Sequence, residues 1–442
     1  MRTVVLASTA LFIARAAAQT FIIDPSFDPG PGFIAPFNTQ VALQPDGKIL
    51  VVGYSGGFNG SLYEGITRLN PDGTRDLTFA PAMDGGTASV ALLPDGRMIV
   101  AGSAQTCNGE LIHGITRLLA NGSNDPSFAH STDGWFFSTA ITPNGNIFAG
   151  GTVFSPLEGT VVYDASGTTI AQEPRTADCM QVQSDGNVMM GSRDEPYALR
   201  LLQNGGQDLT FSANIAVPVV GPGVWDITLL PDERALIAGV LDSVDHQSRA
   251  NIARLNTNGS LDTSFDPGSG LNGEASAVLL LPDGDALVAG TFTTYNGSAL
   301  NGPFARINND GTLDTSYAIS GVRDMLRQPD GKIMLVGEWI TFDGITENGV
   351  MRIMPDINTS APSAHMVTFS AWPNPASELL TIQRNTDGPF QWILTDAMGR
   401  TVKQASASGS HLKLPIDGLE PGTYTMRVTD ERGSHVVRFT KE

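Results

Sequence analysis

The sequence predicts an all-β protein: a seven-bladed β-propeller closed by an N-terminal strand, followed by a small C-terminal β-sandwich. A short turn phrase of the Pro-Asp-Gly type carries this prediction, because it occurs seven times. Its copies occupy residues 45–47, 94–96, 143–145, 184–186, 231–233, 282–284 and 329–331. Equivalent residues are thus 41 to 51 positions apart, and a period of this length is typical of stacked or circular repeats.

Each copy of the phrase lies between strand signals. In the sixth repeat, apolar runs at 277–281 and 286–290 flank the phrase, and further runs follow at 304–307 and 313–317. Two apolar runs joined by Asp-Gly indicate a hairpin, because primed turns need positive φ. Four short antiparallel strands per repeat correspond to one propeller blade.

The uneven ends of the repeat array indicate how the ring closes. A fourth-strand phrase of the form Asp-x-Ser/Thr-Phe/Tyr ends five repeats, but the seventh stops at residues 352–356 without one. The missing phrase lies at the N-terminus, as Asp24–Phe27. We therefore expect Asp24–Phe27 to be the outer strand of the blade that contains Arg352, which would hide an open sheet edge.

Arginine and aspartate recur eight residues apart, symmetrically about the second turn of the repeats. Residues placed in this way face each other across a hairpin, so we predict structural ion pairs. The predicted pairs are Arg68–Asp76, Arg117–Asp125, Arg200–Asp208, Arg254–Asp262, Arg306–Asp314 and, across the closure, Arg352–Asp24. The third repeat has Val162 and Ile170 at these positions and Glu173 in place of the Phe. It should therefore be the weakest blade, with a short or absent outer strand.

The ends and the composition indicate an exported protein. Residues 1–18 read as a signal peptide, 19–357 as the propeller, 358–366 as a linker and 367–442 as a separate domain. Removal of the signal takes two arginines from a chain of net charge −19, which leaves −21. So acidic a surface argues against nucleic acid as a partner. We expect a monomer in solution.

The sequence offers few groups for chemistry. Its six histidines form no zinc pattern, no nucleophile elbow or phosphate loop occurs, and we expect no metal, no cofactor and no assigned catalytic residue. Propellers commonly bind ligands at the channel mouth where the first strands begin. Aligning the repeats on their turns brings five candidate ligand-binding residues to that mouth: Asp178, Trp225, Asp226, Arg323 and Asp324. The alternative is a solvated rim with one packed aromatic ring.

The repeats resemble the delta-60 repeat family. The resemblance rests on phrases such as Pro45-Asp46-Gly47-Lys48 and on the stretch 253–265, which reads Ala-Arg-Leu-Asn-Thr-Asn-Gly-Ser-Leu-Asp-Thr-Ser-Phe. It covers about 330 residues and departs in the third repeat and at Glu233, where Gly is expected. The family implies a propeller and leaves the activity open.

The last 75 or so residues resemble the type A C-terminal sorting domain of the type IX secretion system. The matching residues are Pro373, Asn374, Pro375, Gly399, Arg400, Gly422, Tyr424 and Lys441. The resemblance implies recognition by that secretion machinery and export through the outer membrane of a Bacteroidota-type cell. Removal of the domain, followed by anchoring to surface lipopolysaccharide or by release, would follow. Core packing is the expected role of Tyr424.

Three functions stay open from the sequence. The first is a cell-surface or secreted binding protein with a glycan or protein ligand. The second is a secreted glycan lyase or hydrolase that uses Asp226, Asp324 and Arg323, which would need a suitable carboxylate spacing. The third is an adhesive or structural surface protein whose ring has no ligand.

Overall fold

A computed structural model of the chain describes residues 20–34, 37–54, 56–59, 61–62, 65–129, 132–154, 159–217, 223–356, 369–372, 375–384, 388–397, 400–430 and 433–442. The predicted signal peptide, the linker 358–366 and the sorting residues Pro373, Asn374 and Gly399 lie outside these residues. Every regular element in the described part is a β-strand, which confirms the all-β class. The chain divides into two compact units, within residues 1–357 and 358–442.

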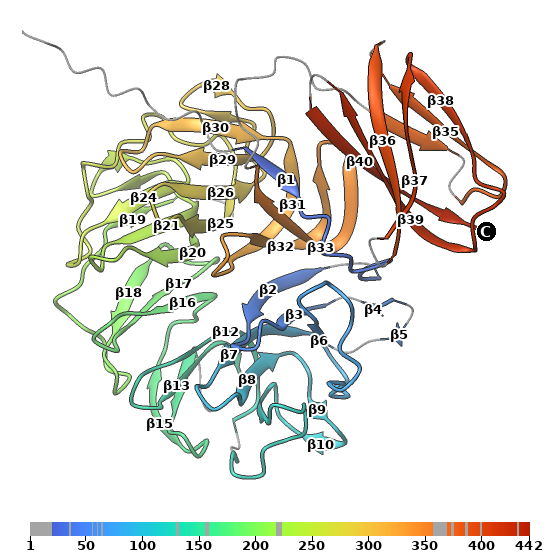
Figure 1. The fold of residues 1–442 in the computed structure, drawn as a ribbon. Coiled ribbons are helices and arrows are strands. Elements are labelled where there is room, and N and C mark those ends of the chain that lie inside the picture. The colour runs from blue at the N-terminus through green and yellow to red at the C-terminus, as the bar shows by residue number, and fades with distance from the viewer. Residues whose placement is uncertain are drawn as a thin grey trace, which may run out of the picture. The chain divides into compact units, whose positions relative to one another are not determined.

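Within the described residues, the first unit contains eleven sheets, and seven of them are each built around one copy of the turn phrase. We call these seven sheets blades 1 to 7 in chain order. Their inner strands are β2 (Asn38–Leu43), β7 (Thr87–Leu92), β12 (Gly134–Ile141), β16 (Cys179–Val182), β20 (Gly223–Leu229), β25 (Ala275–Leu280) and β31 (Ile319–Arg327). Each inner strand contacts the next, and β31 contacts β2, so the inner strands follow one another in a ring (Figure 1).

Two further strands complete most blades. The second strands are β3 (Ile49–Gly53), β8 (Met98–Gly102), β13 (Ile147–Val153), β17 (Val188–Gly191), β21 (Ala235–Val240), β26 (Ala286–Gly290) and β32 (Ile333–Phe342). The third strands are β6 (Ile66–Leu69), β11 (Ile115–Leu118), β14 (Thr160–Tyr163), β18 (Ala198–Leu201), β24 (Ile252–Leu255), β29 (Phe304–Ile307) and β33 (Ile345–Pro355). Their side chains are almost all buried, because neighbouring blades cover both faces of each sheet.

Short hairpins cover the outside of several blades. They are β4 (Gly57–Phe58) with β5 (Ser61–Leu62), β9 (Thr106–Cys107) with β10 (Glu110–Leu111), β22 (Ser243–Val244) with β23 (Gln247–Ser248), and β27 (Thr294–Tyr295) with β28 (Ser298–Ala299). Each pairs with the segment that leads into its own blade, as β22 does with β19 (Ile215–Ala216). Each hairpin therefore ties the connection between the second and third strands of its blade to the segment that leads into that blade.

The turn phrases form hairpins as predicted, but the turn differs from the expected primed type. In blade 6, Gly284 N donates to Leu281 O (3.0 Å), and only the third residue of the phrase has a positive φ, 91° at Gly284. This geometry matches a type I turn followed by a bulge, since Pro suits the first central position.

Two of the departures from this phrase, Ser184 and Glu233, lie in neighbouring blades and contact each other. Glu233 adopts a φ of 66° where the other repeats have Gly. Its carboxylate accepts hydrogen bonds from Ser184 N at 3.3 and 3.4 Å. The other repeats have a proline at the position of Ser184, and proline has no N–H. Ser184 therefore supplies the backbone donor that the carboxylate of Glu233 accepts.

The prediction of four strands per blade is correct for blades 3, 6 and 7 and wrong for blades 1, 2, 4 and 5. In blades 1, 2, 4 and 5 the third strand meets only one residue of the following segment, as in the bridge of Leu69 with Arg75. The Asp-x-Ser/Thr-Phe phrase then forms a turn, closed in blade 1 by Phe79 N donating to Asp76 O (3.3 Å). Regular outer strands occur in blade 3, as β15 (Thr169–Glu173), and in blade 6, as β30 (Leu313–Tyr317).

The expectation of a short or absent outer strand in the third repeat is therefore wrong. β15 pairs with β14 from Thr160↔Glu173 to Tyr163↔Thr169. Blades 3 and 6, which both have a regular outer strand, share the lack of a short Arg–Asp contact. Blade 3 has Val162 and Ile170 at these positions, and in blade 6 Arg306 lies 3.5 Å from Asp314.

The N-terminal strand is three residues earlier than predicted. β1 (Phe21–Ile23) pairs with β33 of blade 7, and Asp24–Phe27 is the turn that follows it. Asp24 N donates to Arg352 O (2.8 Å), so these two residues lie opposite each other.

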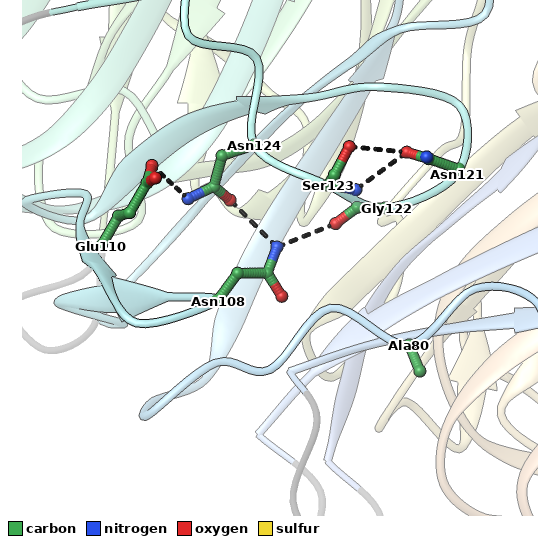
Figure 2. Close-up of a pocket in the computed structure, with 7 residues that line it drawn as sticks. All are labelled: Ala80, Asn108, Glu110, Asn121, Gly122, Ser123 and Asn124. Carbon is green, nitrogen blue, oxygen red and sulfur yellow. Dashed lines mark hydrogen bonds between the residues drawn. The ribbon is translucent and has the colours of Figure 1, made fainter.

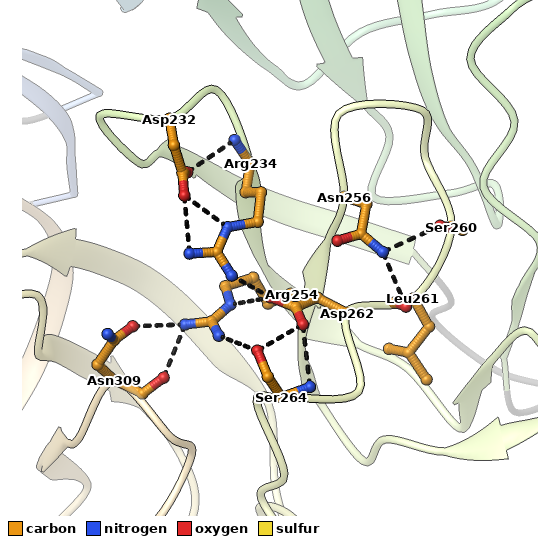
Figure 3. A network of polar contacts seen from close by, with 9 residues as sticks. All are labelled: Asp232, Arg234, Arg254, Asn256, Ser260, Leu261, Asp262, Ser264 and Asn309. Carbon is orange, nitrogen blue, oxygen red and sulfur yellow. Dashed lines mark hydrogen bonds and ion pairs between the residues drawn. The ribbon is translucent and has the colours of Figure 1, made fainter.

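One polar arrangement, which we call the Arg–Asp clamp, recurs at the outer turns, and Figure 3 shows the copy in blade 5. In blade 5, Arg254 Nε donates to Asp262 Oδ2 (2.7 Å) and Arg254 Nη2 to Ser264 Oγ (2.9 Å). The guanidinium lies 5.2 Å from the ring centre of Phe265. The same Nε–Oδ2 contact measures 2.7 or 2.8 Å in Arg68–Asp76, Arg117–Asp125, Arg200–Asp208 and Arg352–Asp24.

The clamp also joins neighbouring blades. Arg254 Nη1 donates to the carbonyl of Asn309 (2.7 Å), which lies in the second turn of blade 6. The equivalent acceptors are Ala120 O for Arg68, Ala165 O for Arg117, Thr257 O for Arg200 and Pro71 O for Arg352. Each arginine therefore connects its own blade with the next, and Arg352 connects blade 7 with blade 1.

A second cation, which the sequence reasoning missed, completes four clamps. Arg234 Nη1 lies 2.5 Å from Asp262 Oδ2. In the other three, Lys48 contacts Asp76 (2.9 Å), Arg97 contacts Asp125 (3.0 Å) and Lys332 contacts Asp24 (3.1 Å). The available signal was the basic residue that directly follows the turn phrase in these four repeats.

Blades 3 and 6 depart from the clamp in different ways. In blade 6, Asp285 occupies the position of the second cation, so Arg306 turns toward it (2.9 Å) and lies 3.5 Å from Asp314. In blade 3, which has Val162, Asn146 Nδ2 donates instead to Gln203 O of blade 4 (2.8 Å). The link between blades is thus kept where the arginine is lost.

The second unit contains two antiparallel sheets. One has β34 (Phe369–Trp372), β35 (Leu379–Arg384) and β38 (His411–Pro415) in the order β34-β35-β38. The other has β36 (Pro389–Asp396), β37 (Thr401–Ser408), β39 (Gly422–Asp430) and β40 (Gly433–Lys441) in the order β37-β36-β39-β40. Their buried residues, among them Leu380, Trp392 and Met426, form one core, as in a sandwich.

We predict that Asp262→Asn lowers the free energy of unfolding by about 3 kcal/mol, because it leaves Arg254 and Arg234 without their shared carboxylate. Asp314→Asn is the matched control, and it should cost less than half as much since its arginine already contacts Asp285. Urea unfolding of the signal-free chain measures both values. Equal losses in the two variants would contradict the clamp.

Candidate functional site

The inner strands begin at one end of the channel, which we call the mouth. One edge of each inner strand has no partner strand within its own sheet, so its backbone N–H groups need other acceptors. Side chains of the preceding blade supply them. Asp226 Oδ2 accepts Val278 N (2.7 Å), Asp324 Oδ2 accepts Val41 N (2.8 Å), Gln40 Oε1 accepts Val90 N (2.7 Å) and Ser89 Oγ accepts Thr139 N (3.0 Å). We call these four side chains the inner belt.

The two belt aspartates use both carboxylate oxygens on backbone donors. Asp226 Oδ1 also accepts Ile227 N (2.8 Å), and Asp324 Oδ1 accepts Met325 N (2.8 Å). Burial, with the charge of Asp324 nearby, raises the pKa of Asp226 to about 7. Burial raises the pKa of Asp324 to about 6. Asp226 and Asp324, which were predicted to bind a ligand, therefore hold neighbouring blades together by accepting backbone hydrogen bonds.

Arg323, the third predicted site residue, has partners of its own. It donates from Nη2 to Glu338 Oε1 (2.5 Å), and its guanidinium lies 4.3 Å from the ring centre of Phe37. Phe37 in turn meets Tyr54 edge-on at 6.2 Å. This group joins blades 7 and 1 at the mouth, and its charges are paired.

Asp178 and Trp225 belong to a second group, on blades 4 and 5. Arg193, which follows β17, donates its backbone N–H to Asp178 Oδ2 (2.8 Å). Its guanidinium lies 5.1 Å from the ring centre of Trp225. Burial raises the pKa of Asp178, although the hydrogen bond from Arg193 opposes the change. Sequence reasoning missed Arg193, because nothing in its repeat position marks it.

The neighbouring blade 3 presents an exposed aromatic pair at the same end. Trp135, near the start of β12, is 51% exposed, and Phe154, just after β13, is 42% exposed. Their ring centres are 5.9 Å apart at an interplanar angle of 73°. Because β12, β16 and β20 contact one another in order, the pair and the Arg193 group lie on successive blades. Together they form what we call the blade 3–5 mouth.

Two shallow pockets lie elsewhere on the propeller. One, of about 350 Å³, is lined by polar residues of the β9–β10 hairpin and the nearby turn. There Asn108 Nδ2 donates to Gly122 O (3.0 Å) and Asn124 Nδ2 to Glu110 Oε2 (2.8 Å), so the lining groups largely satisfy one another (Figure 2). The other, of about 510 Å³, is lined by clamp residues of blades 5 and 6, including Arg234 and Arg254.

No group of three or more potential metal-ligating side chains gathers in the part of the chain that the structure describes. The same described residues include no helix that could span a membrane.

The described sorting residues occupy the second unit. Tyr424 is buried, stacks on Phe439 at 5.7 Å, and donates its hydroxyl to Glu420 O (2.8 Å). Arg400 is exposed and pairs with Asp396 (2.7 Å). Lys441 is buried beside Ala376 and faces Gly422 across the β39–β40 ladder, whereas Pro375 is exposed.

Two family models match the chain. Residues 44–79, 93–128, 230–265, 281–317 and 328–356 match the model described as "Domain of unknown function (DUF5122) beta-propeller". Residues 370–442 match the "Secretion system C-terminal sorting domain". Both confirm the resemblances seen in the sequence. The chain therefore carries repeats of this propeller type and a sorting domain, and the protein is exported by type IX secretion to the cell surface or the medium.

Comparison with solved structures gives remote likenesses. PorZ of Porphyromonas gingivalis, described as an essential surface component of the type-IX secretion system, is 13% identical with a TM-score of 0.40, over 93% of this chain and 69% of that one. Virginiamycin B lyase of Staphylococcus aureus is 12% identical with a TM-score of 0.46, over 76% and 99%. A gluconolactonase of Xanthomonas campestris is 13% identical with a TM-score of 0.37, over 76% and 90%. No curated protein matches the chain.

The pKa shifts predict two separate pH windows for stability. In the folded state Asp226 and Asp324 keep protons up to about pH 7 and 6, whereas the unfolded chain releases them near the ordinary aspartate pKa of 3.8. Since the folded state binds more protons, stability should fall as the pH rises between about 4 and 7. The clamp aspartates act oppositely. Burial alone would raise the pKa of Asp262, but hydrogen bonds from Ser264 and the two arginines lower it, so its contribution is lost only below about pH 4.

The double variant Asp226→Asn, Asp324→Asn should flatten the decline between pH 4 and 7, because neither side chain can then ionise. Urea unfolding across this range measures the slope. Asp46→Asn, an exposed turn aspartate, is the control and should leave the slope unchanged. An unchanged slope in the double variant would contradict the assignment.

Proposed function

We propose that this exported propeller is a binding protein whose ligand, a glycan, docks on the blade 3–5 mouth. The observation that carries the proposal is the exposed pair of Trp135 and Phe154 beside the channel. Clustered exposed aromatic side chains mark binding surfaces, because a soluble protein gains nothing else from leaving them in water. The flat apolar faces of Trp and Phe suit the C–H faces of sugar rings.

The polar groups nearby support a ligand with hydroxyl groups. Asp178 and Arg193 lie on the neighbouring blade, and Trp225 follows on the next. A ring of apolar surface with a few polar groups is the usual composition of a small-molecule site. The mature net charge of −21, from −19 less two arginines of the signal, disfavours nucleic acid.

The geometry supports binding in preference to the glycan-active enzyme. The carboxylates that an enzyme would need, Asp226 and Asp324, each accept two backbone hydrogen bonds, and Arg323 is paired with Glu338. A general base or nucleophile needs a free lone pair directed at the substrate. The third alternative, a scaffold with no ligand, does not explain why Trp135 and Phe154 are exposed.

Binding of the signal-free chain to an array of bacterial and host glycans tests the proposal. We expect at least one glycan to bind, and Trp135→Ala to weaken it at least tenfold, as loss of a central aromatic contact does. Leu209→Ala is the matched control, because Leu209 is 83% exposed on an outer turn of blade 4. Binding by Trp135→Ala equal to the unchanged chain would move the site elsewhere. No glycan bound at all would favour the scaffold.

Delivery to the surface should depend on the second unit. Deletion of residues 367–442, in a host that has the type IX system, should leave the propeller in the periplasm, because the sorting domain engages that machinery. Fractionation with immunoblotting measures this, and the Leu209→Ala chain serves as the exported control. Normal amounts of the shortened chain at the surface or in the medium would contradict it. Anchoring to surface lipopolysaccharide after processing is our further expectation.

A further inference from the structure

Arg193 differs from the other arginines near the mouth in its lack of an acceptor. Arg323 pairs with Glu338 (2.5 Å) and Arg175 with Glu173 (2.7 Å). Among the described residues, no oxygen accepts a hydrogen bond from the guanidinium of Arg193. The carboxylates of Asp178 and Asp226 lie near enough for their charges to act on it, but neither is within 4.0 Å of it. Its five N–H donors are therefore unused by the protein.

Arg193 is nevertheless held in place. Its backbone N–H donates to Asp178 Oδ2 (2.8 Å), and its guanidinium lies 5.1 Å from the ring centre of Trp225. Stacking on an aromatic ring fixes the plane of a guanidinium while leaving its N–H fork open. Such a fork matches the two oxygens of a carboxylate, and the paired contacts are shorter and stronger than neutral hydrogen bonds.

The overall charge limits how acidic the ligand can be. The mature chain carries a net charge of −21, which follows from −19 by the loss of two arginines with the signal. A long polyanion would be repelled by this field. A ligand with a single carboxylate would be repelled much less by this field, and that carboxylate would still pair with the guanidinium of Arg193. Blades 3 and 4 are neighbours, so a short oligosaccharide could meet Arg193 and the aromatic pair at once.

We propose that the blade 3–5 mouth selects glycans that end in a single carboxylate-bearing sugar. The carboxylate pairs with the guanidinium of Arg193, and a sugar ring covers the face of Trp135. This proposal rests on the proposed function and adds the class of ligand. Arg193 is the residue that decides between an acidic terminal sugar and its neutral counterpart.

The test compares matched ligands. Oligosaccharides that end in a uronic or sialic acid are each paired with the carboxyl-reduced form, and calorimetry measures their affinity for the signal-free chain. We expect the acidic member of at least one pair to bind at least tenfold more tightly. Arg193→Gln should abolish that difference, and Arg193→Lys should keep part of it. Arg327→Gln removes the same charge from an exposed residue at the opposite end of β31 and should change the affinity less than twofold.

The outcomes separate the two proposals. Equal binding of acidic and reduced forms, with loss of both in Trp135→Ala, would leave the glycan site standing and overturn the acidic selectivity. An acidic preference that survives in Arg193→Gln would also overturn the role of Arg193. No binding of any pair would overturn the selectivity while the wider glycan array still tests the site. Tighter binding of a peptide with a free C-terminal carboxylate than of any sugar would overturn both. Melting curves of each variant establish that it is folded.

Discussion

The propeller depends on an arginine that belongs to two blades at once. In blade 5, Arg254 pairs with Asp262 in its own outer turn and donates to the carbonyl of Asn309 in the next blade. A buried arginine is stabilised only when its donors are all satisfied. The aspartate, the serine, the aromatic ring and the neighbouring carbonyl provide these contacts together. This explains the composition of the fourth-strand phrase in the blades where it forms a turn.

The clamp and the inner belt act at opposite edges of the same seams. The clamp joins blades at their outer turns, whereas Asp226 and Asp324 join them beside the channel. Between these edges the contact is apolar and almost fully buried. On blade 3, Thr139 N donates to Ser89 Oγ of this belt (3.0 Å), whereas Trp135 is 51% exposed and takes no part in the clamp or the belt.

The sequence predicted the features that follow from symmetry about a turn. The pairing of Arg254 with Asp262 was predictable, because residues equidistant from a hairpin turn face each other. The second cation, Arg234, was not seen because it follows a different turn and meets Asp262 only after the blade folds. The prediction of a short or absent outer strand in blade 3 is wrong, because regular outer strands form in blades 3 and 6, where the short Arg–Asp contact is missing. The alignment of repeats brought Asp226 to the channel, but it could not show that Val278 N needs an acceptor there.

Hydrogen exchange of the closing seam tests the clamp most directly. Arg352 pairs with Asp24 at the N-terminal strand and donates to Pro71 O in blade 1. In Arg352→Gln, amide exchange should accelerate in two places that are far apart in the sequence, β1 with β33 and the turn at residues 70–74. Seams held by other arginines should keep their protection. Faster exchange in β33 and β1 alone, with the blade 1 turn unchanged, would contradict an arginine that serves two blades.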